Sequence, residues 1–202
     1  MANYFAVESI RRNRDEFPNP AEFTVEASQT QGWFKSARQV RAVGQNPQTM
    51  SLDFASAIEV KQLITPYFCP DPPNDPVVPC PLLPYSYLYL DIHSPTYNDQ
   101  YLINTISGAN RDARFLLVRD KVIFDNAGKP IWILWNSPME QVLRFKRNDP
   151  LVFRLFTPDG ITLPLVDDKP EPDEAVQIMA LLGVTPYSRD GSYDNHLLQY
   201  LT

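Results

Sequence analysis

The sequence has few of the residues and motifs on which enzymes depend. Among its 202 residues are only two histidines, His93 and His196, and two cysteines, Cys69 and Cys80. Two thiols are too few for a closed zinc site, which takes four ligands, and a single histidine is weak support for a catalyst. The chain contains no phosphate-binding glycine loop, nucleophile elbow, zinc-protease motif or dinucleotide-binding motif. We therefore expect a protein that is not an enzyme and that holds no metal and no cofactor.

Carboxylates do not change this expectation. Asp167 and Asp168 adjoin, so in a strand they would point to opposite faces and would not act together. Asp71 and Asp75 lie in a proline-rich stretch, where they are interpreted as solvating residues or at most as a weak calcium site.

Long apolar runs are also missing. The longest, at 114–124 and 130–135, are too short or too interrupted to cross a bilayer. The first 17 residues lack the apolar core and small-residue cleavage site of a secretory signal. The net charge of −6 disfavours nucleic acid, which proteins bind by neutralising phosphates with lysine and arginine. We expect neither a membrane span nor a nucleic-acid partner.

What the chain has in excess is proline, with 20 prolines against 7 glycines. Proline removes a backbone donor and fixes φ, so this imbalance favours rigid connections between short elements over helices. Hydrophobic residues make up 44% and charged residues 21%, which is ordinary for a globular protein with a packed core. A chain of this length fits one domain of the larger all-β kind.

Alternation of apolar and polar residues predicts about eight strands. The stretch 51–64 is either one long strand with a bulge or two strands, and 113–125 is likewise one strand or two. We predict an all-β fold, an antiparallel jelly-roll-like β-sandwich, over residues 21–184. The other strand candidates are EFTVEA, YSYLYLDIH, IWILWN, QVLRFKR, LVFRLFT and ITLPLV, with turns at NAGKP and PDG.

One segment is predicted as a helix. Residues 172–183 begin with Pro172 and Asp173, place Val176, Met179, Ala180 and Leu182 at helical spacing, and end at Gly183. A single late helix disfavours alternating βαβ units.

Three further segments are expected to lie outside the regular strands. Residues 1–20 are predicted as an extended arm, 66–84 as a loop with eight prolines that favour polyproline II, and 185–202 as an apolar tail that docks on another surface. Cys69 and Cys80 are either two reduced thiols or a disulfide that closes the proline-rich loop.

The densest basic cluster comes just before the first predicted strand, in SIRRNRDEFPNPAEFTVE at 9–26. This stretch resembles the S-R-D-R-N-R-x-x-Y-P-N-P-x-x-F-x-V motif near the N-terminus of small jelly-roll proteins of large icosahedral double-stranded DNA viruses of algae, amoebae and other protists. Ile10 and Arg11 depart from the usual Arg-Asp. The matching residues are Ser9, Arg12, Asn13, Arg14, Phe17, Pro18, Asn19, Pro20, Phe23 and Val25.

The resemblance implies a structural virion protein, either a minor capsid protein or the penton protein of the vertex. Its partners would then be the major capsid protein and other minor capsid proteins. The chain would be a homo-oligomer or a lattice component of the virion, assembled in the host cytoplasm. Because fold does not give function, this step is an analogy.

On this hypothesis the arm orders on a neighbouring subunit. Arg11, Arg12 and Arg14 would pair with carboxylates there. Pro18 and Pro20 would lower the entropic cost of ordering the arm. Phe17 and Asn19, on either side of Pro18, belong to the same predicted contact segment. The alternative is local: the arginines bind the acidic surface of their own domain and the segment starts the first strand.

A carbohydrate-binding β-sandwich is the alternative function. Trp33, Trp132, Trp135 and the 10 tyrosines are candidate stacking platforms. Trp132 and Trp135 are three residues apart, so in a strand they face opposite sides and at most one of them is expected to be exposed.

Overall fold

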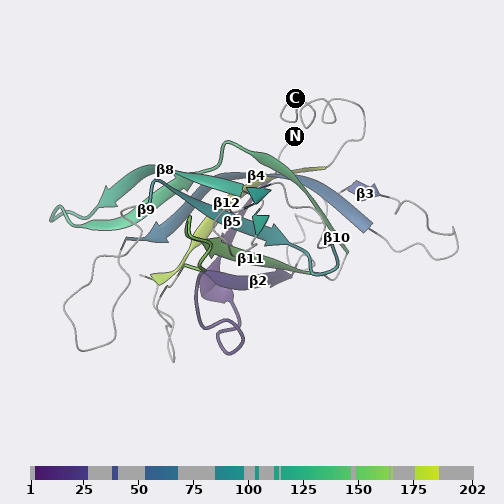
Figure 1. Ribbon diagram of the computed structural model, residues 1–202, viewed down its shortest axis with the longest axis horizontal. Helices are drawn as coiled ribbons and strands as arrows, with labels where there is room; N and C mark the ends of the chain where they lie inside the picture. The colour runs from purple at the N-terminus through teal and green to yellow at the C-terminus, as the bar shows by residue number, and fades with distance from the viewer. Residues whose placement is uncertain are drawn as a thin grey trace, which may run out of the picture.

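The computed structural model describes residues 3–26, 38–40, 53–67, 85–97, 103–104, 112–113, 115–146, 149–163, 165 and 176–186. Within these ranges the regular secondary structure is almost entirely β-strand (Figure 1). A short 3-10 helix, η1 (Ser9–Arg11), follows the first strand. The predicted sites at Trp33, Asp71, Asp75, Asp167, Asp168, His196, Cys69 and Cys80, the proline-rich loop beyond Tyr67 and the tail beyond Pro186 lie outside the described residues.

The first sheet is centred on the longest strand, β4 (Asp53–Pro66). On one side of β4 lies β12 (Met179–Pro186), and β1 (Asn3–Glu8) pairs with the far side of β12. On the other side β9 (Pro130–Asn136) and β10 (Glu140–Lys146) pair with successive halves of β4, so together they act as one strand interrupted at residues 137–139. All these pairs are antiparallel.

The second sheet has β5 (Tyr87–His93) and β11 (Pro150–Phe156) at its centre. The edge strand β2 (Glu22–Glu26) pairs with β11, and β8 (Phe115–Phe124) pairs with β5 through residues 115–118. From Val118 onward β8 pairs with β9 of the first sheet instead. The two sheets are therefore joined at this corner, and the path runs without a break from β1 to β2.

This strand order is that of a jelly roll. When β9 and β10 are counted as one, the chain has eight long strands within the described residues, and the first sheet holds the first, eighth, third and sixth of them in that order. The second sheet holds the second, seventh, fourth and fifth. This is the double Greek key of jelly-roll sandwiches. The shorter β3 (Arg38–Val40) extends the β12 side of β4, while β6 (Ile103–Asn104) and β7 (Asp112–Ala113) pair with each other.

The core lies between the sheets and follows from the period-two alternation. Along β5, for example, Leu88, Leu90 and Ile92 point inward and are buried. Phe23 and Phe153 stack across β2 and β11 with ring centroids 5.1 Å apart. The indole of Trp135 is fully buried, and its Nε1 donates a hydrogen bond of 2.9 Å to Thr65 Oγ1. A buried tryptophan needs such a partner.

The predicted helix at 172–183 is wrong over its described part, because residues 179–186 form strand β12. Ala180, Leu182 and Val184 are buried in the core, whereas the alternate residues Met179 and Leu181 are half-buried. This alternation has the period of two that is typical of a strand. Both edges of β12 find backbone partners, β1 on one side and β4 on the other. Tertiary pairing therefore overrides a local pattern that also fits a helix.

The N-terminal boundary also needs correction. Residues 3–8 were predicted as part of an extended arm, but they form β1 and pair in register with β12. Phe5 and Val7 point toward the core, as alternation in NYFAVE would suggest. Thr185 and Pro186, predicted to begin the tail, are the last residues of β12. The domain thus begins at or before Asn3 and includes Pro186.

The two ambiguous strand predictions each resolve to one strand. β4 is continuous, with a register shift against β12 that leaves Lys61 without a Cα partner there. β8 is continuous, with a shift at Asp120. Both predicted turns are present, with Gly128 at φ 78° and Gly160 at φ 76°, a conformation that glycine adopts at little cost. The described residues of ITLPLV, 161–163 and 165, form no strand, although Thr162 bridges to Phe156.

Candidate functional site: the loop of residues 9–21

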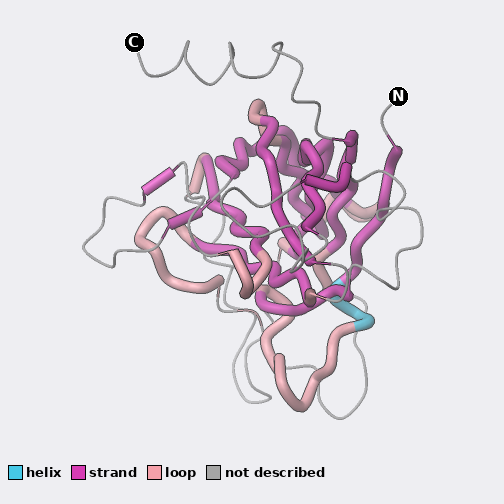
Figure 2. The backbone as a smooth tube through the Cα atoms, turned by 90° about the vertical axis from the view of Figure 1, so that its right-hand side faces the viewer, coloured by secondary structure: helices cyan, strands magenta, loops and turns pink. Residues whose placement is uncertain are grey.

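The motif that resembles viral jelly-roll proteins lies mostly in the loop between β1 and β2. These are the edge strands of the two sheets, so the loop spans one end of the sandwich (Figure 2, where η1 marks its start in cyan). At its beginning Ser9 N donates to Ile178 O at 2.9 Å, and at its end Leu155 N donates to Ala21 O at 2.9 Å. The loop is therefore tied to both sheets.

Arg12 is the centre of the loop. Its side chain is buried, with the residue only 4% exposed. Nε donates to Phe17 O at 2.7 Å, Nη2 to Pro18 O at 2.9 Å and Nη1 to Ser9 O at 3.0 Å. Nη1 also donates to Gln177 Oε1 at 2.9 Å. The planar guanidinium carries five donors in a fixed fork, so it can bond several carbonyl oxygens arranged around it. The ammonium group of a lysine lacks this fixed geometry.

A second set of bonds holds the loop on the segment just before β12. Ser9 Oγ donates to Gln177 Oε1 at 2.9 Å and accepts from Ile178 N at 2.8 Å. Gln177 Oε1 thus accepts from both Ser9 and Arg12. Ser9 and Gln177 are buried, so each of these polar groups needs the bond that it receives.

The asparagines of the motif shape the two turns of the loop. Asn13 O accepts from Phe17 N at 2.8 Å, and Asn13 Oδ1 accepts from Asp15 N at 3.2 Å. Asn19 Oδ1 accepts from Ala21 N at 2.9 Å, which is the local pattern that asparagine favours in turns. Asn19 Nδ2 donates to Leu163 O at 2.8 Å and so docks the loop onto the segment that follows β11.

The structure corrects the role predicted for Arg12, because a guanidinium buried against its own chain does not reach a neighbouring subunit. Arg14 is half-buried and donates through Nη2 to Ile10 O at 2.8 Å. Arg11 is exposed, and its Nε lies 3.6 Å from Glu8 Oε2. These contacts of Arg12 and Arg14 with their own chain favour the local alternative, and the acceptors of Arg12 named above are backbone carbonyls and an amide oxygen.

The outer surface of the loop is not basic. Its exposed residues are Arg11, Asn13, Asp15, Glu16 and Pro18, while Phe17 and Asn19 are half-buried and Pro20 is buried. Contact of this surface with a neighbouring subunit stays a prediction.

Sequence reasoning missed a buried pair on β5. Asp91 Oδ2 lies 2.6 Å from His93 Nδ1, and both residues are buried on the side of the strand away from Leu90 and Ile92. A carboxylate at Nδ1 fixes the orientation of an imidazole. The signal was the spacing of two in Asp-Ile-His. The adjacent Ser94 hydroxyl donates to Asp149, so these neighbours do not form a serine–histidine–aspartate relay.

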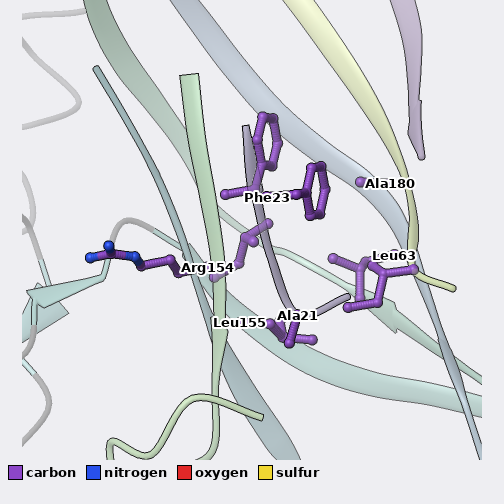
Figure 3. A pocket seen from close by; sticks show the side chains of 9 residues that line it. Ala21, Phe23, Leu63, Arg154, Leu155 and Ala180 are labelled. Carbon is purple, nitrogen blue, oxygen red and sulfur yellow. The ribbon is translucent and has the colours of Figure 1, made fainter. Parts of the chain in front are cut away.

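A small cavity lies in the core beneath β2 (Figure 3). The empty space in it, including the part that is open to solvent, is about 230 Å³. Ligand pockets are larger, at roughly 300–1,000 Å³. Its one charged residue, Arg154, points away from the apolar side chains in Figure 3 and bonds Glu22 Oε1 through Nε at 2.7 Å. The cavity is thus a packing gap. Its lining consists of Ala21, Phe23, Leu63, Leu90, Phe153, Arg154, Leu155, Ile178 and Ala180.

The tryptophans divide as their spacing predicts. Trp135 is fully buried and Trp132 is half-buried. The exposed aromatic rings in the described part of the chain belong to Tyr4, Tyr87 and Phe124. Whether any of them binds a sugar stays a prediction.

No helix among the described residues is long and apolar enough to cross a membrane. No group of three or more histidine, cysteine or acidic side chains in the same ranges is placed to hold a metal ion. Compared with known proteins, the chain matches no family model and no curated protein.

Proposed function

We propose that this chain is a structural component of a virion, a minor capsid or vertex protein of a large icosahedral double-stranded DNA virus. It stabilises the shell through protein–protein contacts. In this role it binds the major capsid protein and other minor capsid proteins as part of a homo-oligomer or lattice.

The observation that supports the proposal is that motif residues form the hydrogen bonds that hold the loop between β1 and β2. Ser9, Arg12, Asn13 and Asn19 each make specific bonds within the loop that joins the two sheets. A motif that resembles viral jelly-roll proteins thus specifies the connection between the first two strands of a jelly roll. The resemblance therefore concerns residues that determine the fold, and it coincides with the topology those proteins have.

The role of the motif within the proposal changes accordingly. Its buried residues shape the end of the sandwich instead of reaching out as an arm, and intersubunit contacts fall to exposed residues of the loop and of the rest of the domain.

Particle fractionation tests the proposal directly. Purified particles from infected host cells are separated into shell and core fractions, and the chain is quantified in each by mass spectrometry against the most abundant shell protein. We expect the chain in the shell fraction at a fixed ratio to that protein. Recovery only from the soluble fraction of infected cells would refute the proposal.

A sugar-binding module is the second candidate, and one observation favours it. Tyr87 is 39% exposed and meets Tyr89 edge-on with ring centroids 5.7 Å apart, so β5 presents an aromatic surface. Sugars stack on such surfaces. Saturable binding on a glycan array that is lost in Tyr87→Ser, and kept in a Tyr4→Ser control, would establish this function instead.

A further inference from the structure

The hairpin formed by β8 and β9 extends beyond the sandwich. β5 pairs with β8 only through residues 115–118, and β4 pairs with β9 only through Trp132–Trp135. Past Arg119, β8 pairs with β9 from Lys121, opposite Leu134, to Phe124, opposite Pro130, and Figure 1 shows the two strands running together past the rest of the described chain. We refer to residues 118–131 as the β8–β9 hairpin.

Exposed apolar side chains concentrate on this hairpin and its base. Six large apolar residues of the described chain are exposed, and three of them are Val118 at 45%, Phe124 at 57% and Ile131 at 36%. A fourth, Tyr87, is the cross-strand partner of Val118. Single exposed apolar residues are normal, but a group gathered on one projecting element marks an interaction site.

The turn at the end of the hairpin is rigid. Asp125 N donates to Lys129 O at 2.7 Å, and Asp125 Oδ1 accepts from Ala127 N at 2.8 Å and Lys129 N at 2.7 Å. Gly128 supplies the positive φ that this turn needs. A preformed hairpin loses little conformational entropy on binding, which favours affinity.

The charge of the hairpin differs in sign from the rest of the chain. Three basic and two acidic residues give positions 118–131 a formal charge of +1, so the remainder carries −7 of the total of −6. Lys121 and Lys129 are exposed near Phe124. An acidic protein surface complements them, and another copy of this chain offers one. An anionic membrane is the poorer fit, because the remaining −7 would be repelled from it.

We propose that the β8–β9 hairpin binds a second copy of this chain. Phe124 and Ile131 form the apolar centre of the contact, and Lys121 and Lys129 pair with carboxylates of the other copy at its rim. Because the hairpin carries a net positive charge and the rest of the chain a net negative one, the hairpin of one copy meets a different surface of the next, which is the head-to-tail contact that builds rings or lattices. The inference rests on the proposed function, since it supplies the contact by which a shell component repeats.

Sedimentation velocity of the full chain over a range of concentrations tests the proposal. We expect the wild type to self-associate, and Phe124→Ser combined with Ile131→Ser to weaken association on the order of tenfold or more, as loss of an aromatic anchor does. Ile161→Ser is the matched control, since Ile161 is 61% exposed outside the hairpin. Lys121→Glu with Lys129→Glu should weaken association as well, and added salt should weaken the wild type. Circular dichroism checks that every variant is folded.

The outcomes separate this inference from the proposed function. A wild type that stays monomeric at all concentrations, or equal association of the hairpin and control variants, overturns the inference. So does hairpin-dependent binding to vesicles of anionic phospholipid without self-association. If the chain is in the shell fraction and these results are negative, only the inference fails. If it self-associates through the hairpin but is absent from particles, only the proposed function fails.

Discussion

Replacing Arg12 with methionine is the sharpest test of how the loop of residues 9–21 is held. Methionine keeps an unbranched apolar side chain in place of the arginine stem and removes the charge and the donors of the guanidinium. Four acceptors of Arg12 are Ser9 O, Phe17 O, Pro18 O and Gln177 Oε1, at 2.7–3.0 Å. Each of them loses a charged donor in the variant, although Gln177 Oε1 keeps its bond from Ser9 Oγ and Ser9 O keeps its bond from Arg12 N.

The structure sets the expected size of the loss. A hydrogen bond to a charged group contributes roughly 1.5–3 kcal/mol, so four such bonds bound the effect at about 6–12 kcal/mol. Removing a buried guanidinium also removes its own desolvation cost, and breaking one side of a buried charged network costs about 3–5 kcal/mol in practice. We therefore expect Arg12→Met to lower the free energy of unfolding by about 3–5 kcal/mol, a large share of the roughly 5–15 kcal/mol of a typical domain.

Urea unfolding followed by tryptophan fluorescence measures this loss. The control is the adjacent Arg11→Met, because the Arg11 side chain is 87% exposed and an exposed ion pair is worth about 0–1 kcal/mol. A double-mutant cycle with Gln177→Ala should return a coupling of roughly 1–3 kcal/mol. An Arg12→Met loss below about 1 kcal/mol, or one equal to that of Arg11→Met, would show that the guanidinium does not hold the loop.

Three smaller predictions concern other parts of the sandwich. Gly128→Ala should cost about 1 kcal/mol because φ is +78° there. Gly183→Ala should stay within about 0.5 kcal/mol in urea unfolding, since its new Cβ would meet the flexible side chain of Lys61 at 3.4 Å and the Tyr4 ring at an ordinary 3.7 Å. The hydrogen bond to Asp159 raises the pKa of Tyr85, so the folded state holds this proton longer than the unfolded chain and stability falls as pH rises through 10. In Asp159→Ala the ionisation of Tyr85, followed by tyrosinate absorbance, should move to lower pH. An unchanged titration in that variant would contradict the role of Asp159. Trp135→Phe should remove the blue-shifted part of the fluorescence and cost about 1–3 kcal/mol, the loss of a buried hydrogen bond; emission from the wild type that is already at the wavelength of exposed indole would refute the assignment.

Strand positions followed from the sequence where one face of the strand is buried. Period two is strong in YLYLDIH and LVFRLF, and β5 and β11 occupy those residues. The same rule also fits NYFAVE, but the basic cluster behind it suggested an arm, so β1 was missed. Residues 179–183 satisfied both a helical and an alternating pattern, and only the pairing of β12 with two neighbours decides between them.

The interior of the loop was beyond sequence reasoning for a different reason. Three arginines in four positions look equivalent in the sequence, yet Arg12 is buried, Arg14 is half-buried and Arg11 is exposed. The difference depends on Gln177, which is 165 positions away. No local sequence pattern can predict a partner at that distance. The turns at Asn13 and Asn19, by contrast, depend on hydrogen bonds to residues two positions later, and asparagine favours such turns, so they can be predicted from the sequence.

The pairing of β1 with β12 has a consequence for synthesis. Strand β1 leaves the ribosome long before β12, the strand with which it pairs, since Asn3 pairs with Val184. At roughly 5–20 residues per second, β1 waits on the order of 10–40 s for its partner. During that time its edges are open to other nascent chains on the same messenger. A chaperone that binds residues 3–8, or translation spaced widely enough to keep nascent chains apart, should therefore raise the yield of folded protein.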